Sequence, residues 1–236
     1  MSEKKIKASL AIINKNDCAG LERIYFQIPI EELYEVFVID GQSTDHTVDF
    51  CRKHAIRCIV QDKLGRGDAF RLAAREAKGD SIIFLSSDGN ENPTDIPKFI
   101  QLLEQGNDLV IASRLAKGAH NKDDGRFFPI RKWMLYLFTL IVNIAWKSNL
   151  TDVWNGYRAF NKDKFQKLPT TANNNLIELQ QTIRALKRGY KVAEFPSIEG
   201  PRIAGKTQNP LLKTGIGLIG ILLEELIHYR NNWTPE

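Results

Sequence analysis

The chain has 236 residues, enough for one sizeable domain or for one domain with an appended segment. Hydrophobic residues make up 43% and charged residues 26%, a balance typical of globular proteins that excludes a globally disordered chain. The formal net charge of +5 suits anionic ligands such as phosphates or acidic lipid head groups. It is too small to indicate nucleic-acid binding, and the sequence shows no RNP-like or zinc-finger pattern.

Three cysteines, Cys18, Cys51 and Cys58, are an odd number without metal-ligand spacing, so we expect buried, reduced thiols of a cytoplasmic protein. Residues 1–5 lead directly into a predicted strand and show no signal-peptide pattern. The longest apolar run, residues 133–146, is shorter than the roughly 20 residues that a membrane-spanning helix needs. The sequence therefore favours a cytoplasmic protein, peripheral to the inner face of a membrane rather than crossing it.

The first half of the chain alternates short apolar runs with helical patterns. The predicted strands cover residues 7–14, 34–40, 57–60, 81–85 and 108–112. The predicted helices between them cover residues 46–55, 68–78 and 93–105. This alternation predicts an α/β domain with a mostly parallel, doubly wound sheet flanked by helices. In such sheets, ligands bind beyond the carboxyl ends of the strands.

The second half has longer helical patterns and more loop. Polar loops are expected at residues 115–129 and 199–209, strands at 154–160 and 191–195, and helices at 131–147, 174–188 and 211–229. Basic and aromatic residues flank the apolar helix at 131–147, so it either lies in a membrane interface or packs into the core or a dimer contact. The same alternatives hold for the last helix. We therefore predict a main domain at 1–209 and an interfacial or oligomer-packing helix at 210–236.

An acidic side chain ends the second predicted strand. Asp40 follows an apolar run and precedes a turn that contains Ser43 and Asp45. A carboxylate there can accept hydrogen bonds from a nucleobase, and the turn can surround a ribose. The alternative is that Asp40 only organises its own turn, which is common for aspartate.

A second pair of oxygen-bearing side chains follows the fourth predicted strand. Asp88 and Asn90 are two residues apart, so on extended chain they project to the same side. Their oxygens, completed by those of a diphosphate and water, suit Mg²⁺ or Mn²⁺. Such a metal would stabilise a departing nucleoside diphosphate as a Lewis acid. The alternative is again a simple turn.

A Gly-x-Gly segment at residues 65–68 stands at the entrance of a predicted helix and could cradle a phosphate, although it lacks the third glycine of the dinucleotide fingerprint. A plain helix entrance explains it equally well. Arg114, Arg202 and Lys206 lie in predicted loops, where they could pair with a diphosphate.

Taken together, these segments resemble the family-2 glycosyltransferases with the GT-A fold, especially the polyprenyl-phosphate sugar transferases. The resemblance covers roughly residues 7–209 in the family's order, through the segments 13–17, 38–45, 65–69, 85–90, 113–114, 152–160, 177–178, 188–190, 194–196 and 202–205. Residues 38–45 resemble the family's nucleoside-binding Val-Val-Asp-x-x-Ser-Thr-Asp. Residues 152–160 closely resemble its Asp-x-x-Ser-Gly-Phe-Arg-Ala-Phe.

The resemblance implies an inverting transfer of a sugar from a nucleotide-sugar donor to an acceptor. It assigns donor-binding roles to Asn16, Asp17, Asp40, Ser43, Asp45, Gly65, Gly67 and Asp68, metal binding to Asp88 and Asn90, and roles in catalysis to Arg114, Asp152, Glu178 and Arg202. The sequence departs from the family pattern at three places. Ser86 replaces the first Asp of the Asp-x-Asp metal segment, Lys15 replaces an aromatic residue, and Gln208 stands where a basic residue is common.

The acceptor remains open between two classes. A hydroxyl acceptor needs a general base, for which Asp152 and Glu178 are candidates. A polyprenyl phosphate is already an anion and needs no general base, and Arg114, Arg131 and Arg202 could pair with its charge. The second half of the chain shows no acidic pair, which favours the polyprenyl phosphate as acceptor. A sugar-nucleotide-binding protein without catalysis is a third alternative. A pyrophosphorylase is disfavoured, because residues 13–17 lack a Gly-rich loop with basic residues.

Overall fold

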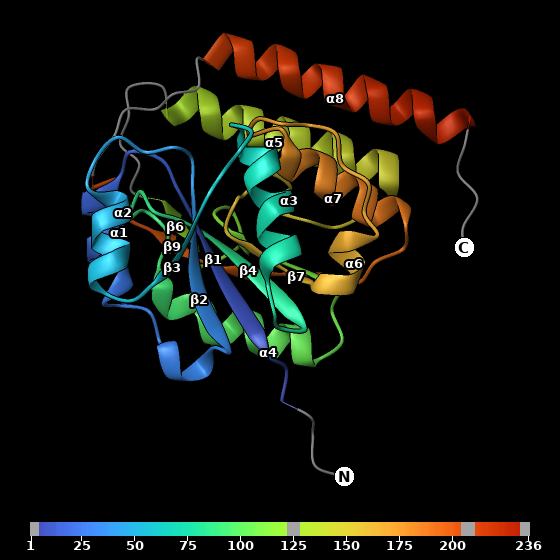
Figure 1. The fold of residues 1–236 in the computed structure, drawn as a ribbon. Coiled ribbons are helices and arrows are strands. Elements are labelled where there is room, and N and C mark those ends of the chain that lie inside the picture. The colour runs from blue at the N-terminus through green and yellow to red at the C-terminus, as the bar shows by residue number, and fades with distance from the viewer. Residues whose placement is uncertain (1–4, 122–127, 204–210, 232–236) are drawn as a thin grey trace.

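The computed structural model describes residues 5–121, 128–203 and 211–231 (Figure 1). Within these residues, seven strands form one sheet in the order β3–β2–β1–β4–β7–β5–β8. The strands are β1 (Ala8–Asn14), β2 (Glu35–Asp40), β3 (Arg57–Val60), β4 (Ser81–Ser86), β5 (Leu109–Ser113), β7 (Arg158–Asn161) and β8 (Val192–Pro196). All neighbours pair in parallel except β7, which is antiparallel to both β4 and β5. The predicted mostly parallel α/β sheet is confirmed.

Helices cover both faces of this sheet (Figure 1). The helices are α1 (Cys18–Tyr25), α2 (Thr47–Lys53), α3 (Arg66–Glu76), α4 (Ile96–Glu104), α5 (Phe128–Trp146), α6 (Lys162–Gln166), α7 (Ile177–Lys187) and α8 (Leu211–Asn231), with short 3₁₀ turns η1 (Ile30–Glu32) and η2 (Pro93–Asp95). Apolar residues of α1, α2 and α4 form one core with the sheet. Those of α3, α6 and α7 form a second core on the opposite face.

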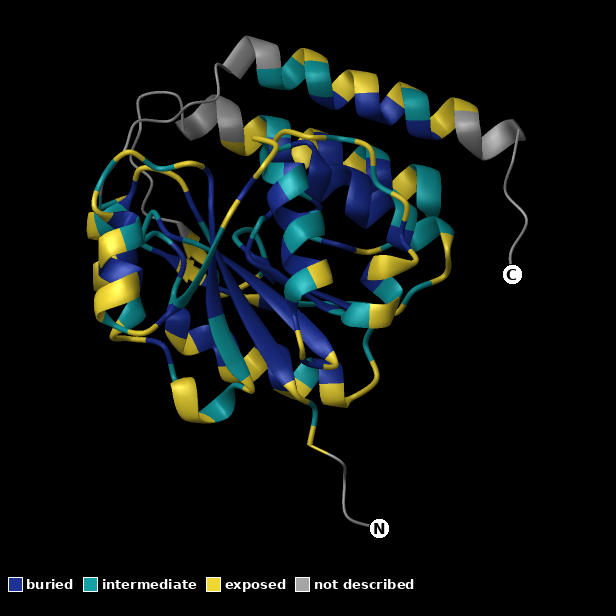
Figure 2. Cartoon of the chain, viewed as in Figure 1, coloured by how far each residue is buried: buried dark blue, intermediate teal, exposed yellow. Residues whose placement is uncertain are grey.

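The period-two geometry of a strand explains how one sheet serves two cores. In β1, Leu10 and Ile12 belong to the first core, whereas Ala11 between them belongs to the second. All three side chains are fully buried, as is typical of a parallel sheet covered on both faces. Figure 2 shows the central strands almost uniformly buried.

The strand predicted at 154–160 is wrong in its start. Regular pairing begins only at Arg158, and β7 runs antiparallel between β4 and β5. The residues that precede Arg158 do not form a regular strand, because their polar groups make hydrogen bonds outside the pairing of the sheet. The Asn155 side chain donates to the backbone oxygen of Ala112 (2.6 Å), and its own backbone oxygen accepts from the buried Arg158 guanidinium (2.7 Å).

Several short elements were not predicted from the sequence: α1, α6, η1, and a two-stranded parallel pair of β6 (His120–Asn121) with β9 (Ile198–Glu199). The three cysteines are free thiols, but the expectation that all are buried is wrong. Only Cys51 is buried, and Cys18 and Cys58 are partly exposed.

A third apolar cluster joins α5, α7 and α8 above the second core (Figure 1). From α5 it takes Phe138 and Val142, and from α8 it takes Leu218 and Leu222, all buried. The C-terminal helix therefore packs onto the main domain, and its described part shares a hydrophobic core with α7.

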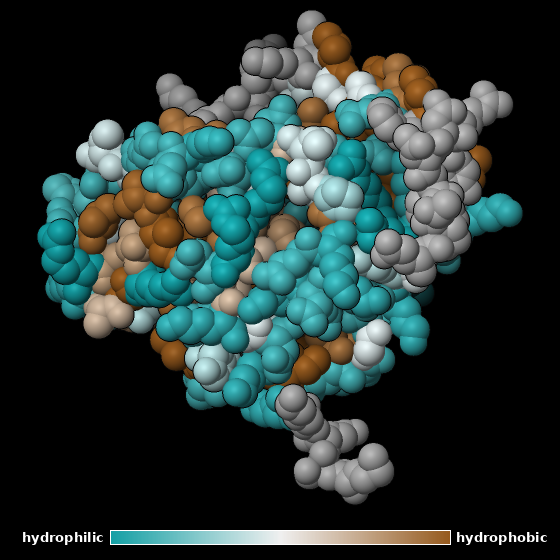
Figure 3. Space-filling model, turned by 45° about the vertical axis from the view of Figure 1, so that its right-hand side comes forward, coloured by the Kyte–Doolittle hydropathy of each residue, from teal (hydrophilic) through white to brown (hydrophobic). Residues whose placement is uncertain are grey.

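The opposite faces of α5 and α8 expose large apolar side chains. On α5 these are Trp133, Tyr136, Leu137, Leu140 and Ile144, and on α8 they are Ile216, Ile219, Leu223, Leu226 and Ile227. Figure 3 shows apolar side chains along the upper edge of the molecule, where α8 lies. Such a contiguous apolar surface is typical of an interaction site. Among the described helices, none is long and apolar enough to span a membrane.

A buried carboxylate anchors α8 to α7. Glu225 is 2% exposed, and its carboxylate accepts hydrogen bonds from Arg184 Nε (2.6 Å) and Lys187 Nζ (2.5 Å). The neighbouring Glu224 reaches Arg184 at 3.5 Å with a side chain that is 41% exposed. Since a buried charge without its partner is unfavourable, Glu225 contributes far more to the docking of α8 than Glu224 does.

We predict that Glu225→Ala lowers the free energy of unfolding by about 3 kcal/mol, because it leaves two cations without their buried partner. The matched substitution Glu224→Ala should cost less than about 1 kcal/mol, as expected for an exposed pair. Urea denaturation followed by circular dichroism measures both. Equal effects of the two substitutions would contradict the anchoring role of Glu225.

Candidate active site

Polar side chains gather at the carboxyl edge of the sheet, where the strand order reverses. The chain leaves β1 toward β2 and β3 on one side and later returns to place β4 on the other side. Ligands of open α/β sheets bind at such a switch point. The parallel register aligns the last residue of β1, Asn14, with Asp40 and places Ile13 opposite Ser86. Asp40 and Asp88 thus flank the end of β1 from two sides, as the sequence predicts.

Asp40 is fully buried and bonded within the protein. One carboxylate oxygen accepts from Asn14 Nδ2 (3.3 Å), and the other accepts from the backbone of Ser43 (2.9 Å). The Asn14 side chain also donates to Thr47 (3.0 Å). These contacts match the alternative interpretation of Asp40 as the residue that organises its turn. Its direct contact with a nucleobase stays a prediction.

The loop after β1 and the turn after β2 are bonded to each other. The backbone of Asn16 donates to Ser43 Oγ (2.8 Å), and Asn16 Oδ1 accepts from the backbone of Thr44 (2.7 Å). Asp45 accepts from the backbone nitrogens of Cys18 (2.9 Å) and Thr47 (3.0 Å). Burial opposes ionisation of Asp45, but a hydrogen bond from Thr47 Oγ1 (2.6 Å), together with these backbone bonds, outweighs it and lowers its pKa. The predicted donor residues Asn16, Ser43 and Asp45 therefore form one connected rim.

Next to this rim lie oxygen atoms that no described group satisfies. Oδ1 of Asp17, Oδ1 of Asp88 and Oδ1 of Asn90 are all buried without a hydrogen-bond partner among the described residues. Burial, and then the nearby Asp88 carboxylate, raise the pKa of Asp17 to about 6. Buried polar atoms are normally satisfied, so these oxygens indicate a missing ligand.

The donor set fits a hard cation such as Mg²⁺ or Mn²⁺, which prefers oxygen ligands. In the described part of the chain, however, no group of three or more His, Cys, Asp or Glu side chains is arranged to hold a metal by itself. A cation at Asp88 and Asn90 would thus need further oxygens from a bound ligand. This agrees with the expectation from Ser86, which removes one carboxylate from the segment.

Arg202 reaches the same place from the loop that follows β9. Its Nε lies 3.3 Å from Asp88 Oδ2. The backbone nitrogen of Gly200 donates to the backbone oxygen of Asn90 (2.8 Å), and that of Ile203 donates to the backbone oxygen of Asp88 (3.0 Å). The loop therefore lies directly on the Asp88 turn. Lys206, also predicted in this loop, lies outside the described residues.

Two arginine–carboxylate pairs, each with a buried carboxylate, lie near these acidic residues. Arg114 Nε and Nη2 contact Asp152 Oδ2 and Oδ1 at 2.7 and 3.0 Å, and Asp152 is fully buried. Burial disfavours the charge of Asp152, but Arg114 outweighs it and lowers the pKa of that carboxyl. Arg66 Nε donates to Glu178, which is 2% exposed. Both candidate bases thus contact an arginine: Asp152 through both carboxylate oxygens, and Glu178 through Oε1.

The helix entrance at residues 65–68 does not form the predicted phosphate cradle. The backbone nitrogens of Gly67 and Asp68 donate to Asn173, to its backbone oxygen (3.4 Å) and its side chain (2.8 Å). A Cβ at Gly67 would lie 2.1 Å from the backbone oxygen of Ala172, so glycine is required there for close packing. The groups predicted to bind phosphate are already used by the 172–173 segment.

Three further residues belong to the site although the sequence did not single them out: Arg66, Glu91 and Glu199. Burial, and then Asp88 and Glu199, raise the pKa of Glu91 to about 8. Burial likewise raises the pKa of Glu199 to about 7, with Arg114 opposing the shift. In the sequence, Arg66 lies in the Gly-x-Gly segment, Glu91 follows the Asp88 segment, and Glu199 precedes Arg202. These positions are the only sign in the sequence that the three residues belong to the site.

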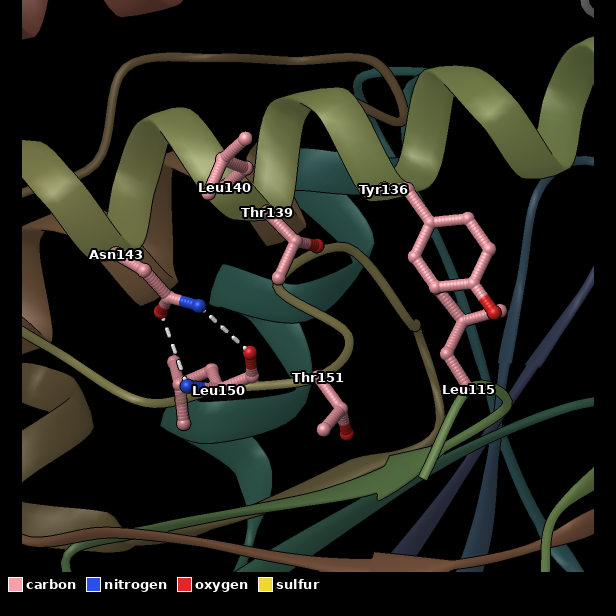
Figure 4. A pocket seen from close by; sticks show the side chains of 7 residues that line it. All are labelled: Leu115, Tyr136, Thr139, Leu140, Asn143, Leu150 and Thr151. Carbon is pink, nitrogen blue, oxygen red and sulfur yellow. Dashed lines mark hydrogen bonds between the residues drawn. The ribbon is translucent and has the colours of Figure 1, made fainter. Parts of the chain in front are cut away.

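A pocket of about 220 Å³ opens between α5 and the loops that carry the Arg114–Asp152 pair (Figure 4). Its lining is mostly apolar: Leu115, Tyr136, Thr139, Leu140, Asn143, Leu150 and Thr151. Leu115 and Thr151 are the chain neighbours of Arg114 and Asp152. The pocket therefore lies next to the chain segments that carry the partly exposed Arg114 and its partner Asp152.

The raised pKa of Glu199 predicts a stability that depends on pH. Its folded-state pKa of about 7 exceeds the usual 4.5, so the folded protein binds this proton more tightly than the unfolded chain does. The free energy of unfolding should therefore fall as the pH rises from 4.5 through 7. Glu199→Gln removes this loss and should stabilise the protein at pH 8 by on the order of 1–3 kcal/mol, with little effect at pH 5. Urea denaturation of the ligand-free protein at both pH values measures it; a pH-independent effect would contradict the assignment.

Comparison with known proteins shows the family of this chain and agrees with its fold. A family model described as "Glycosyl transferase family 2" matches residues 12–169. Glycosyltransferase AglJ of Haloferax volcanii is 29% identical over 193 residues, which cover 79% of this chain and 61% of AglJ. The dolichyl-phosphate hexose transferase of the same organism is 27% identical, over 81% of this chain and 82% of that protein.

Among solved structures, glucosyl-3-phosphoglycerate synthase from Mycobacterium tuberculosis, in complex with Mn²⁺, UDP and glucosyl-3-phosphoglycerate, superposes with a TM-score of 0.73. The superposition covers 94% of this chain and 80% of the synthase chain. The two sequences are 19% identical, so this likeness shows a shared fold. Since the family model spans most of the described sheet and the strand-end segments of the crevice, the chain belongs to glycosyltransferase family 2.

Proposed function

We propose that the chain transfers a sugar, with inversion, from a nucleotide-sugar donor to a polyprenyl phosphate. The observation that carries this proposal is the set of buried, unpartnered oxygens of Asp17, Asp88 and Asn90 at the switch point of the sheet. A nucleoside diphosphate with a divalent cation would satisfy them. The presence of Mn²⁺ and UDP in the synthase of the same fold supports this choice of ligand.

Asp88 and Asn90 would hold the cation, as Mg²⁺ or Mn²⁺, together with donor oxygens. The cation would supply Lewis-acid stabilisation of the leaving diphosphate. The rim of Asn16, Ser43 and Asp45 is placed to surround the nucleoside, and Arg202 lies close enough to Asp88 to face the diphosphate. Arg114 is held in place by Asp152 at the inner end of the crevice.

The pairing of the two candidate bases supports a phosphate acceptor. Asp152 is held by Arg114 and Glu178 by Arg66, so each carboxylate is engaged by a cation. An acceptor hydroxyl would need a base to take its proton, whereas a phosphate oxygen is already anionic at neutral pH. The apolar pocket beside Arg114 suits the hydrocarbon end of such an acceptor. The name of the dolichyl-phosphate hexose transferase relative points the same way.

The exposed apolar faces of α5 and α8 support a peripheral position at the inner, cytoplasmic face of a membrane. The pocket opens beside α5, whose Leu140 belongs both to the pocket lining and to the exposed face. A lipid acceptor could then reach Arg114 from the membrane without crossing water. The side chain of Arg131, another predicted partner of the acceptor phosphate, lies outside the described residues.

We predict that Asp88→Asn weakens Mn²⁺-dependent binding of UDP at least about tenfold, because it removes the charge of the proposed metal ligand. It should also abolish transfer of radiolabelled sugar from UDP-sugars to a short-chain polyprenyl phosphate. Calorimetry measures the binding, and the exposed Asp163→Asn in α6 is the control.

The same experiment separates the alternatives. Transfer to sugar hydroxyls, but not to polyprenyl phosphate, would replace the proposed acceptor with a glycan. Binding of nucleotide without transfer to either acceptor would identify a binding protein without catalysis. Unchanged binding by the Asp88→Asn variant would contradict the proposed metal site.

We also predict that Ile144→Glu combined with Leu223→Glu lowers the binding of the protein to anionic phospholipid vesicles roughly tenfold or more, because two apolar contacts become charged. Both side chains are more than half exposed, so the fold should be retained. The control is Ile30→Glu, an exposed apolar position in η1. Co-sedimentation measures binding, and analytical ultracentrifugation of the same variants tests the alternative, a homodimer through α5 and α8.

A further inference from the structure

An acid of β8 holds the loop that leads into β7. Glu194 lies two residues after Val192, so the two side chains project to the same face of the sheet. Val192 packs there against the second core and the third apolar cluster. The Glu194 carboxylate instead accepts from the backbone nitrogens of Thr151 (2.6 Å) and Asp152 (2.8 Å), one on each oxygen. It also accepts from Thr151 Oγ1 (3.0 Å), so two successive residues of the loop engage both of its oxygens.

Thr151 extends this contact to the segment that follows β5. Its Oγ1 lies 2.6 Å from Ser113 Oγ. The single hydroxyl proton of Thr151 is donated to Glu194, so Ser113 donates its own proton to Thr151. Ser113 Oγ in turn accepts from the backbone nitrogens of Leu115 (3.2 Å) and Ala116 (3.0 Å). One chain of hydrogen bonds therefore runs from β8 through two hydroxyl groups to the loop after β5.

The two segments joined in this way carry the Arg114–Asp152 pair. Arg114 lies between Ser113 and Leu115 in the chain, and Asp152 directly follows Thr151. The ion pair fixes the two side chains relative to each other. The hydrogen bonds to the β8 carboxylate fix both segments relative to the sheet, because β8 itself is paired with β5. Both kinds of contact are needed to give the guanidinium a defined place.

We propose that Glu194 is a positioning residue that, through Thr151 and Ser113, holds Arg114 in place for the acceptor phosphate. This inference rests on the proposed function, in which the acceptor reaches Arg114. Glu194 is not placed in contact with substrate, because both of its oxygens are engaged within the protein. The chain of hydrogen bonds does not include Asp88 or the rim proposed to surround the nucleoside. Its loss should therefore weaken binding of the acceptor and spare binding of the donor.

Three substitutions separate hydrogen bonding from packing. Glu194→Gln keeps the size of the side chain but leaves one acceptor oxygen, so its amide nitrogen meets one of the two backbone N–H groups. Thr151→Val removes the hydroxyl and keeps a branched side chain in the lining of the pocket. Thr151→Ser keeps the hydroxyl and removes a methyl group instead. If hydrogen bonding positions Arg114, Thr151→Val is the more harmful of the two, whereas a role in packing alone predicts the opposite order.

The first measurement follows transfer of radiolabelled sugar from UDP-sugars to a short-chain polyprenyl phosphate by the full-length variants. We expect Glu194→Gln and Thr151→Val to raise the KM for the acceptor on the order of 10- to 100-fold, because a displaced group binds and orients its substrate poorly. Thr151→Ser should raise this KM less than Thr151→Val does. Binding of UDP with Mn²⁺, measured by calorimetry, should change less than about threefold. The exposed Glu31→Gln is the control.

The second measurement does not depend on the function. Arg114 Nε donates to Asp152 (2.7 Å), so its proton should exchange slowly with water in the wild type. We expect this proton to exchange at least about tenfold faster in Glu194→Gln than in Glu31→Gln, because the loop of Asp152 has lost an anchor. Nuclear magnetic resonance of ¹⁵N-labelled protein follows the Nε–H signal, which Arg114→Lys identifies.

The outcomes separate the inference from the function on which it rests. If the wild type transfers no sugar to a polyprenyl phosphate, the proposed function fails, and the acceptor role of Glu194 fails with it. If the wild type is active and Glu194→Gln keeps either its acceptor KM or the slow exchange at Arg114, only the role of Glu194 is overturned. An equal loss of UDP binding also overturns that role. If Glu194→Gln does not fold, the order of the two Thr151 variants decides: a higher acceptor KM for Thr151→Val supports the proposal, and an equal or lower one overturns it.

Discussion

Two arginine–carboxylate pairs, each with a buried carboxylate, connect the two halves of the chain at the carboxyl edge of the sheet. Arg66 and Arg114 come from the first half of the chain, and their partners, Glu178 and Asp152, come from the second. A buried charge without its partner is strongly unfavourable, so each pair fixes the position of two distant segments. Gly156 fits the same constraint, because a Cβ there would lie 2.1 Å from Arg66 Nη2. The arrangement of these segments at the carboxyl edge thus depends on charge compensation as well as on apolar packing.

Between these pairs, the crevice keeps acids that are not compensated. Asp17 and Glu91 both have raised pKa values because burial and neighbouring carboxylates disfavour their charge. Ionised acids at these positions lower the free energy of unfolding, and they lie where a cation and a diphosphate are proposed to bind. Asp152 differs from both, because Arg114 outweighs its burial and lowers its pKa.

The sequence predicted those features that depend on local pattern. The apolar runs that became β2 and β4 are followed by, or end in, polar residues, and parallel pairing with β1 brings such ends to one edge. The convergence of Asp40 and Asp88 therefore followed from topology. Pairings between distant segments could not be predicted in this way. Neither the use of Asn173 to close the 65–68 helix entrance nor the Arg114–Asp152 contact has a signal in spacing or periodicity.

The direction of β7 was likewise not visible in its sequence, and it has a consequence for the way the crevice is assembled. In an antiparallel strand, the residues that precede the strand lie at the edge where its parallel neighbours end. Asp152 and Asn155 reach the crevice for this reason, whereas in a parallel strand they would emerge on the far side of the molecule. One reversed strand therefore brings an incoming segment to the same edge as the outgoing turns of β1, β2 and β4, without a crossover helix of its own.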